Sequence, residues 1–522
     1  MNPSRANFIA IIISIVAVLA AYLVADRVFN FMPHIEDEMA YVWQAQVLAT
    51  GKVMLPSPPD PKSILVPFVV DYNGNRFGKY PLGWPIVLAL GLLLHARDWI
   101  NPILGGLGVW LTYLLGKKIF DERIGLLAAL LTSTSPFFLM NSGSLLSHSW
   151  ALILSLAFVL AWLDTFDLTN RQIREDHGAR KGNFLAKFVS FVVHSPPMWM
   201  TVSVSGLSLG LLAMTRPYTA LAIGLPFFIH GLFLLWRGDK STRLHVLTIG
   251  VLAAFVAALV PLWQYAMTGN PMLNPYTLWW KYDKIGFGPG FGREPGGHNL
   301  DWAWVNLKVS FEAGWSDFFG WKKASWLFLP FGVFALGRNL RAWLVALVFP
   351  SIVLLYMAYW IGSDLYGPRY YYEGFYSLTI VTAAGIFWFG EQVIKKTRYR
   401  RWMQIAATLL SVFLIGYNLA VYLPNRLKNM TDLYGISRAM LTPFETAQAK
   451  MLTPAMVIVH FQSQWTEYGG LLELQNAELT SPFIFALSRG EDADSLLPRD
   501  YPNRQMIYYY PNEPDVFYEY PK

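Results

Sequence analysis

Long apolar runs recur from near the start of the chain to about residue 423, and they constrain the fold more than any other feature. Several approach the roughly 20 residues that a helix needs to cross a bilayer core of about 30 Å. Hydrophobic residues make up 54% of the 522 residues and charged residues 14%, against about 45–50% and 25% in soluble proteins. The chain is therefore not a soluble globular enzyme. We predict eleven spanning helices, at 7–25, 100–116, 124–141, 148–165, 198–214, 217–235, 244–266, 325–337, 341–361, 374–390 and 403–423.

One further apolar run, Leu82–Ala96, decides which side of the membrane each loop faces. As a helix, its 15 residues span only about 22 Å and begin next to Pro81, so we predict a surface or re-entrant helix. The segments on the N-terminal side then carry 18 Lys and Arg, whereas the short turns opposite keep only Arg216 and Arg369. By the positive-inside rule the N-terminus is cytoplasmic, and we expect a multi-pass protein of the plasma (inner) membrane.

Two long loops are then predicted on the extracytoplasmic side, 26–99 and 267–324. The first contains an apolar pattern at helical spacing over 36–49, which indicates an interfacial helix with an acidic start. The second holds the glycine-rich stretch 286–299, typical of a mobile loop or lid, followed by a Trp-rich helix candidate at 301–312. Both loops are long enough to build a site.

The tail differs from the rest of the chain. Residues 1–423 have a net charge of +11 and residues 424–522 one of −4, so the overall excess of +7 belongs to the membrane part and does not indicate nucleic-acid binding. We divide the chain there into a transmembrane domain and a small extracytoplasmic α/β domain. Short apolar strand candidates in the tail lie at 455–461, 482–487 and 505–510.

Candidate catalytic groups gather on the predicted outer side. Three consecutive acids, Glu36, Asp37 and Glu38, open the interfacial helix, and Lys79 follows in GKYPLGWP. The plain alternatives are an acidic cap on a surface helix and a solvated lysine. Arg216 in MTRPY and Arg369 in YGPRYYYEG lie in the outer turns; either could simply snorkel to lipid headgroups.

Metal chemistry has little support in the sequence. The chain has no Cys and no HExxH motif, so we predict no dedicated metal site. His148 and His298 are predicted on the outer side, although a lone histidine more often bonds locally. A carboxylate and several cations facing one compartment instead suit glycosyl transfer from a lipid phosphate. The carboxylate accepts the proton of an acceptor hydroxyl, and the cations stabilise the departing phosphate.

At this point the sequence resembles the C-type membrane glycosyltransferases (GT-C fold), particularly the bacterial branch similar to protein O-mannosyltransferases (glycosyltransferase family 39) and the aminoarabinose transferase. The resemblance covers roughly residues 30–390, and the motifs that carry it are DEMAY (37–41), YPLGWP (80–85), LLGKKIFDERIG (114–125), MTRP (214–217) and GPRYY (367–371). It implies an all-α polytopic fold and a polyprenyl-phosphate sugar donor. It also implies Asp37 as the catalytic base, supported by Glu38.

The remaining candidates are assigned around that donor. We expect the donor phosphate to contact Lys79, Arg216, Arg369 and Tyr370, and we take as candidate substrate contacts Glu36, Tyr80, His148, Tyr218 and His298. The acceptor is a glycan, a lipid or a protein, and membrane lipids are further partners. The sequence requires no cofactor, and members of the family vary in metal dependence.

Two alternatives stay open. A lipid-linked sugar flippase or transporter would be expected to show inverted repeats, broken helices or charges within spans, and none is evident in the sequence. A ligase-like or polymerase-like enzyme of the other membrane architecture would place its main loop and arginines late in the chain. The early acidic loop argues against that reading.

Overall fold

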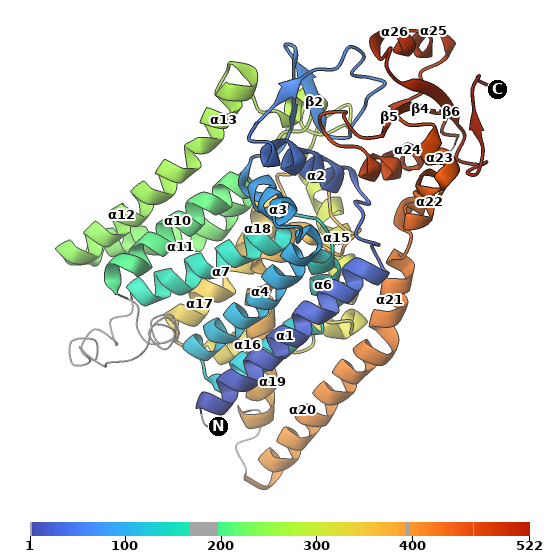
Figure 1. The fold of residues 1–522 in the computed structure, drawn as a ribbon. Helices are drawn as coiled ribbons and strands as arrows, with labels where there is room; N and C mark the ends of the chain where they lie inside the picture. Colours follow the sequence, from blue (N-terminus) through green and yellow to red (C-terminus); the bar gives the residue numbers. More distant parts are fainter. Residues whose placement is uncertain (1–2, 167–196, 393–396, 463) are drawn as a thin grey trace, which may run out of the picture.

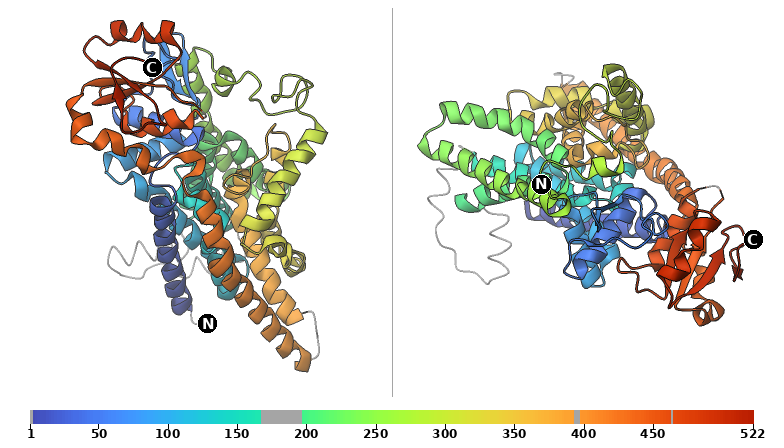
Figure 2. Two further views of the ribbon diagram at one scale, coloured as in Figure 1. Left: turned by 90° about the vertical axis from the view of Figure 1, so that its right-hand side faces the viewer. Right: turned by 90° about the horizontal axis from the view of Figure 1, so that it is seen from above.

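The computed structural model describes residues 3–166, 197–392, 397–462 and 464–522. A bundle of long helices carries a smaller part at one end, where loop 26–99 and the C-terminal segment lie together (Figures 1 and 2). The N-terminus lies at the opposite end, the lower end in Figure 1. We call the two ends of the bundle upper and lower as in that view.

Seven helices of the described residues are long and apolar enough to cross a membrane. The bent pair α5 (Glu122–Ser133) and α6 (Pro136–Gly143), at 61° to each other, makes an eighth if it counts as one span. The bend follows from Pro136, which has no N–H to continue a helix and starts a new one capped by Ser135. The seven are α1 (Pro3–Arg27), α4 (Arg97–Ile119), α7 (His148–Thr165), α10 (Met198–Thr215), α11 (Pro217–Arg237), α12 (Lys240–Ala257) continued by α13 (Leu259–Thr268), and α20 (Thr397–Tyr417) with its extension.

Three predicted spans are not among these seven helices. The run at 325–337 forms α16 (Leu329–Leu336). The run at 341–361 forms two helices, α17 (Leu340–Ala346) and α18 (Val348–Tyr356). The run at 374–390 forms α19 (Phe375–Gln392). A count of eleven spans therefore stays a prediction. The disputed run at 82–96 forms α3 (Gly83–Leu93) of 11 residues, about 16 Å and too short to cross the core.

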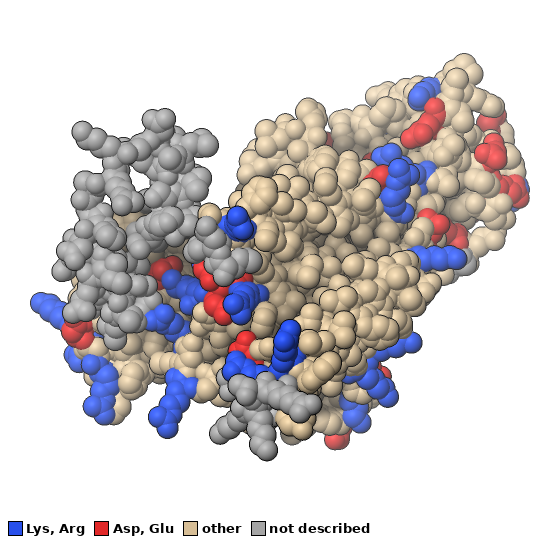
Figure 3. Space-filling view, turned by 90° about the horizontal axis from the view of Figure 1, so that it is seen from below, with Lys and Arg blue, Asp and Glu red and all other residues tan. Residues whose placement is uncertain are grey.

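Basic residues lie at the lower helix ends. Lys117 and Lys118 end α4, Arg237 ends α11 and Lys240 begins α12, and Figure 3, seen from below, shows many Lys and Arg side chains on this face. The pattern is the one on which the positive-inside argument rests, although which compartment this face meets stays a prediction. The predicted inner stretch 171–187 lies outside the described residues.

Loop 26–99 contains the predicted helix, α2 (Glu36–Ala49), and a small antiparallel sheet that we did not predict. The strand order is β1-β3-β2, with β1 (Leu55–Pro56), β2 (Val69–Tyr72) and β3 (Asn75–Gly78). Asn73 and Gly74 connect β2 to β3 with φ of 51° and 78°, as a tight hairpin turn requires. Strand β3 leads directly into Lys79 and Tyr80.

The last long helix runs further than predicted. Helix α20 continues through Asn418–Tyr422 into α21 (Leu423–Met430), so the helix extends beyond the predicted span 403–423. Pro424 does not stop it, because it stands in the first turn of α21, where its missing N–H is tolerated. From there the chain enters the C-terminal segment at the upper end.

The three strands predicted in the C-terminal segment are confirmed. Strands β4 (Ala455–Val459), β5 (Phe483–Leu487) and β6 (Gln505–Tyr509) are parallel, and β7 (Phe517–Tyr518) adds antiparallel to β6, in the order β5-β4-β6-β7. The sheet packs on loop 26–99, since Leu487 N–H donates to the Ser63 carbonyl at 2.7 Å and Tyr468 OH to the Leu65 carbonyl at 2.7 Å. Whether residues 424–522 form an independent domain stays a prediction.

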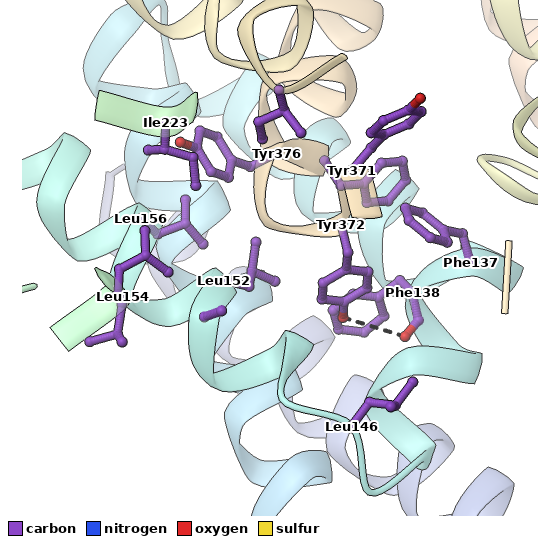
Figure 4. Close-up of a cluster of buried hydrophobic side chains, with 14 of the residues drawn as sticks. Phe137, Phe138, Leu146, Leu152, Leu154, Leu156, Ile223, Tyr371, Tyr372 and Tyr376 are labelled. Atoms are coloured by element: carbon purple, nitrogen blue, oxygen red, sulfur yellow. Dashed lines mark hydrogen bonds between the residues drawn. The ribbon is translucent and has the colours of Figure 1, made fainter. Parts of the chain in front are cut away.

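A buried aromatic and leucine cluster supports the turn before α19. Figure 4 shows Tyr371 and Tyr372 among Phe137, Phe138 and the leucines of α7, with Tyr372 OH donating to the Phe138 carbonyl at 3.5 Å. Tyr372 is fully buried. The short 3₁₀ turn Arg369–Gly374 is thereby anchored by packing, which orients the residue at its start.

Candidate active site

One cavity of about 800 Å³ opens at the upper end, between loop 26–99, loop 267–324 and the turns that carry the two predicted arginines. It brings together residues more than 300 positions apart, since α2 and the turn at 369 both line it. Of the eleven predicted site residues, eight line this cavity: Glu36, Asp37, Lys79, Tyr80, Arg216, Tyr218, Arg369 and Tyr370. Glu38, His148 and His298 do not.

Asp37 lies in the first turn of α2 with both carboxylate oxygens engaged. Tyr80 OH donates to Oδ1 at 2.7 Å, and Arg369 Nη2 donates to Oδ2 at 3.4 Å. Burial by itself raises the pKa of Asp37, but Arg369, Lys79 and the Tyr80 hydrogen bond outweigh it and bring the pKa below its usual value. Asp37 is therefore ionised at neutral pH and able to accept a proton.

The two flanking acids have different surroundings. Glu36 is half-buried and lines the cavity beside Asp37, and burial raises its pKa. Glu38 is 1% exposed and turns away from the cavity. Its carboxylate accepts four hydrogen bonds, from the N–H groups of His34 (2.8 Å), Ile35 (3.3 Å) and Leu145 (2.8 Å) and from Tyr366 OH (3.3 Å). Glu38 thus bonds around the start of α2 and does not line the cavity, because a side chain one position along a helix points about 100° away. Its support of Asp37 in catalysis stays a prediction.

Arg369 approaches Asp37 from the turn that Figure 4 shows anchored in the core. Gly367 makes the approach possible, because its φ is +71° and a Cβ there would lie 2.7 Å from the Phe137 ring. While Nη2 bonds to Asp37, Nη1 is buried and has no hydrogen-bond partner among the residues described. A guanidinium with a buried, unused donor beside a cavity is suited to bind an anion.

Arg216 reaches the cavity from the junction of α10 and α11. Its Nε lies 3.1 Å from Oε1 of the fully buried Glu373, and the same oxygen lies 2.8 Å from His148 Nδ1. His148 therefore sits behind Arg216 and does not line the cavity, and its role as a substrate contact stays a prediction. His298 is likewise set apart: it lines a smaller pocket of about 90 Å³, and its Nε2 lies 2.9 Å from the Met357 carbonyl.

Lys79 is a third predicted cation in the cavity, which Lys284 and Arg293 also line. Its partner was missed by sequence reasoning. Lys79 Nζ lies 3.5 Å from Oδ2 of Asp283, a buried residue of loop 267–324. Burial lowers the pKa of Lys79, while Asp283 opposes that change. No short motif marks Asp283, and only the meeting of two distant loops reveals it.

Aromatic side chains form much of the remaining wall: Tyr276, Trp280, Tyr282, Tyr356, Tyr359 and Trp360. On another side, Val260 and Trp263 of α13 and the exposed Met272 supply apolar lining. Such a mixture of broad apolar surfaces with a few charged groups is typical of a ligand site. Within the described part of the chain, no three His, Cys, Asp or Glu side chains gather closely enough to hold a metal ion.

Part of the chain matches a known protein family. Residues 90–276 match the family described as oligosaccharyl transferase STT3, N-terminal. No curated protein matches the chain.

Two solved structures are similar over nearly the whole chain. ArnT from Cupriavidus metallidurans, bound to undecaprenyl phosphate, is 12% identical, with a TM-score of 0.53 over 94% of this chain and 88% of that one. The archaeal oligosaccharyltransferase AglB from Archaeoglobus fulgidus, in complex with an inhibitory peptide and a dolichol-phosphate, is also 12% identical, with a TM-score of 0.52 over 96% and 69% of the two chains. At this low sequence identity, the similarity shows a shared fold only. The chain has the GT-C fold of the C-type membrane glycosyltransferases.

Proposed function

We propose that the protein is an integral-membrane glycosyltransferase that moves a sugar from a polyprenyl-phosphate donor to an acceptor hydroxyl on the extracytoplasmic side. One observation carries the proposal: the Asp37 carboxylate and the Arg369 guanidinium share a cavity, and Nη1 of Arg369 has no partner in the described structure. A base and an anion-binding donor side by side are what this reaction needs.

In the proposed reaction, Asp37 accepts the proton of the acceptor hydroxyl while that oxygen attacks the anomeric carbon. The bond between the anomeric carbon and the phosphate oxygen breaks, and its electron pair leaves with the polyprenyl phosphate. Because attack and departure occur on opposite faces, the configuration at the anomeric carbon inverts. Phosphate is a good leaving group once cations stabilise its charge, so a second carboxyl acting as an acid is unnecessary, in contrast to glycoside hydrolysis.

The donor phosphate is assigned to three of the five cations that line the cavity, Arg369, Arg216 and Lys79. Each has a carboxylate partner: Asp37, Glu373 and Asp283, respectively. Buried charges are tolerated only when paired in this way. An incoming phosphate therefore shares these cations with carboxylates already in place. Tyr370, which lines the cavity beside Arg369, is a further hydroxyl donor to the phosphate.

The remaining walls of the cavity suit the sugar and the isoprenoid chain of such a donor. The aromatic wall, with Tyr276 and Trp280 nearest to Lys79, offers flat surfaces for a sugar ring. The apolar lining from α13 suits the first isoprene units, because burying their methylene groups is favourable. Tyr218 and Glu36 are left for the acceptor, whose class (glycan, lipid or protein) the cavity does not specify.

The test is Asp37→Asn in the purified protein, assayed for sugar transfer from a polyprenyl-phosphate sugar and for polyprenyl-phosphate binding. We expect transfer to fall by about 10²–10⁴, the usual loss for a positioned base, with phosphate binding retained. Glu36→Gln is the comparison that identifies the base, because Glu36 lines the same cavity without bonding to Arg369 in the described structure. As a proposed acceptor contact it should lose less transfer than Asp37→Asn and keep phosphate binding. Normal turnover in Asp37→Asn with loss in Glu36→Gln would move the base by one position.

A further inference from the structure

The surroundings of Lys79 are unusual for a lysine that faces a cavity. Its side chain is 4% exposed, and that of its partner Asp283 is 2% exposed. The ammonium lies 3.3 Å from the Phe68 ring centroid, and the centroids of Tyr80, Tyr276 and Trp280 lie 5.2, 5.0 and 5.1 Å away. Aromatic faces attract a cation but accept no strong hydrogen bond from its three N–H donors.

Asp283 is the only hydrogen-bond acceptor that the described structure offers to this ammonium, at 3.5 Å. Hydrogen bonds to its second oxygen, Oδ1, fix the orientation of the Asp283 carboxylate. Oδ1 accepts from Tyr359 OH and from Trp360 Nε1, both at 3.0 Å. Because those two donors occupy Oδ1, Oδ2 is left toward Lys79. Asp283 thus connects loop 267–324 with Lys79, directly after β3 of loop 26–99, and with the segment that leads to Arg369.

The charge on Lys79 depends on its neighbours. Burial favours the neutral amine and lowers the pKa of Lys79, and the carboxylates that oppose this are Asp283 first, then Asp37 and Glu36 of α2. Asp37 already bonds to Arg369 and Tyr80. Loss of Asp283 therefore removes the largest influence that keeps Lys79 charged, and a neutral amine attracts a phosphate far less than an ammonium does.

We propose that Asp283 is a positioning residue for donor binding: it holds the Lys79 ammonium beside the cavity and makes loop 267–324 part of the donor-phosphate site. The inference rests on the proposed function, since it assigns Lys79 to the phosphate. Two N–H donors of the ammonium have no partner in the described structure, so they remain for phosphate oxygens while Asp283 keeps the third. Asp283 itself touches no reacting atom.

The test measures binding of polyprenyl phosphate to the detergent-solubilised full chain between pH 6 and pH 9.5 in Asp283→Asn, Lys79→Met and the double variant. We expect Asp283→Asn to weaken binding about tenfold at neutral pH, the loss that corresponds to one charge-assisted hydrogen bond. The affinity of this variant should also decline at a lower pH than that of the wild type. In Lys79→Met that alkaline decline should be absent, and adding Asp283→Asn should change little.

Asp301→Asn is the matched control, because Asp301 is an exposed acid of the same loop in the first turn of α15 (Leu300–Asp317); it should bind as the wild type does. An equal loss at every pH in Asp283→Asn, repeated in the Lys79→Met background, would mean that Asp283 supports only the fold and would overturn the inference. Wild-type affinity in Lys79→Met would overturn it as well, while leaving Asp37 and Arg369 in their proposed roles. If the wild type bound no polyprenyl phosphate, the proposed function itself would fail.

Discussion

Glu38 and Asp37 are adjacent carboxylates whose roles a pair of substitutions should separate. All four groups around Glu38 donate to it, and three of them are backbone N–H groups. In Glu38→Gln one oxygen becomes an NH₂ group, which cannot accept. The arrangement that keeps most bonds turns this amide toward Leu145, which leaves two buried donor groups, the Leu145 N–H and the new NH₂, facing each other without an acceptor. Two buried unsatisfied donors cost about 1–3 kcal/mol each, so we expect about 2–6 kcal/mol of destabilisation.

The assay is thermal unfolding of the purified protein in detergent together with turnover per folded molecule. Glu38→Gln should unfold at a clearly lower temperature, while its folded fraction keeps its turnover. Asp37→Asn, the control, faces the cavity and should unfold near the wild-type temperature without transferring sugar. If Glu38→Gln unfolded like the wild type and yet lost turnover as Asp37→Asn does, Glu38 would take part in the chemistry and the argument from its hydrogen bonds would be refuted.

Arg369→Ala should weaken binding of polyprenyl phosphate by about 10- to 100-fold, the equivalent of a charge-assisted bond of roughly 1.5–3 kcal/mol. Arg369→Lys should restore binding only in part, because lysine cannot make a bidentate contact. Full restoration of binding would mean that a single positive charge at this position is sufficient. Tyr80→Phe removes a hydrogen bond that lowers the pKa of Asp37. That pKa should rise, and since the base must be ionised, the acid limb of kcat/KM should move to higher pH; an unchanged limb would argue against Asp37 as the base. A reporter inserted at Asn73 should be active outside the cytoplasm and one at Asp239 inside, and activity of both on one side would contradict the topology.

Much of the helical framework could be predicted from local pattern. A run such as 7–25 is apolar on all sides and nearly long enough to span, which few soluble structures accommodate. Strands β4, β5 and β6 could also be predicted from the sequence, because short apolar runs bounded by polar residues are typical of buried parallel strands. The hairpin of β2 and β3 carried a signal that we overlooked, the Asn73-Gly74 pair between two extended segments.

The residues of the site could be predicted from the sequence only in part. Eight predicted residues do line one cavity, since charged and aromatic residues beside apolar runs gather at helix ends. The sequence alone left three consecutive acids as candidates. The rotation of α2 separated them, turning Asp37 to Arg369 and Glu38 to the Leu145 N–H group. That rotation is decided by packing against distant segments, which local pattern does not contain.

By itself, therefore, the sequence determined that the chain is a helical membrane protein with an acidic helix start and arginines in short turns, because hydropathy and spacing are local properties. The tertiary structure alone decided the pairings: Lys79 with Asp283, Arg216 with Glu373 and Arg369 with Asp37. Each joins segments more than 150 residues apart, and each forms because a buried charge is stable only beside its opposite, a condition met only once the whole fold has closed around it.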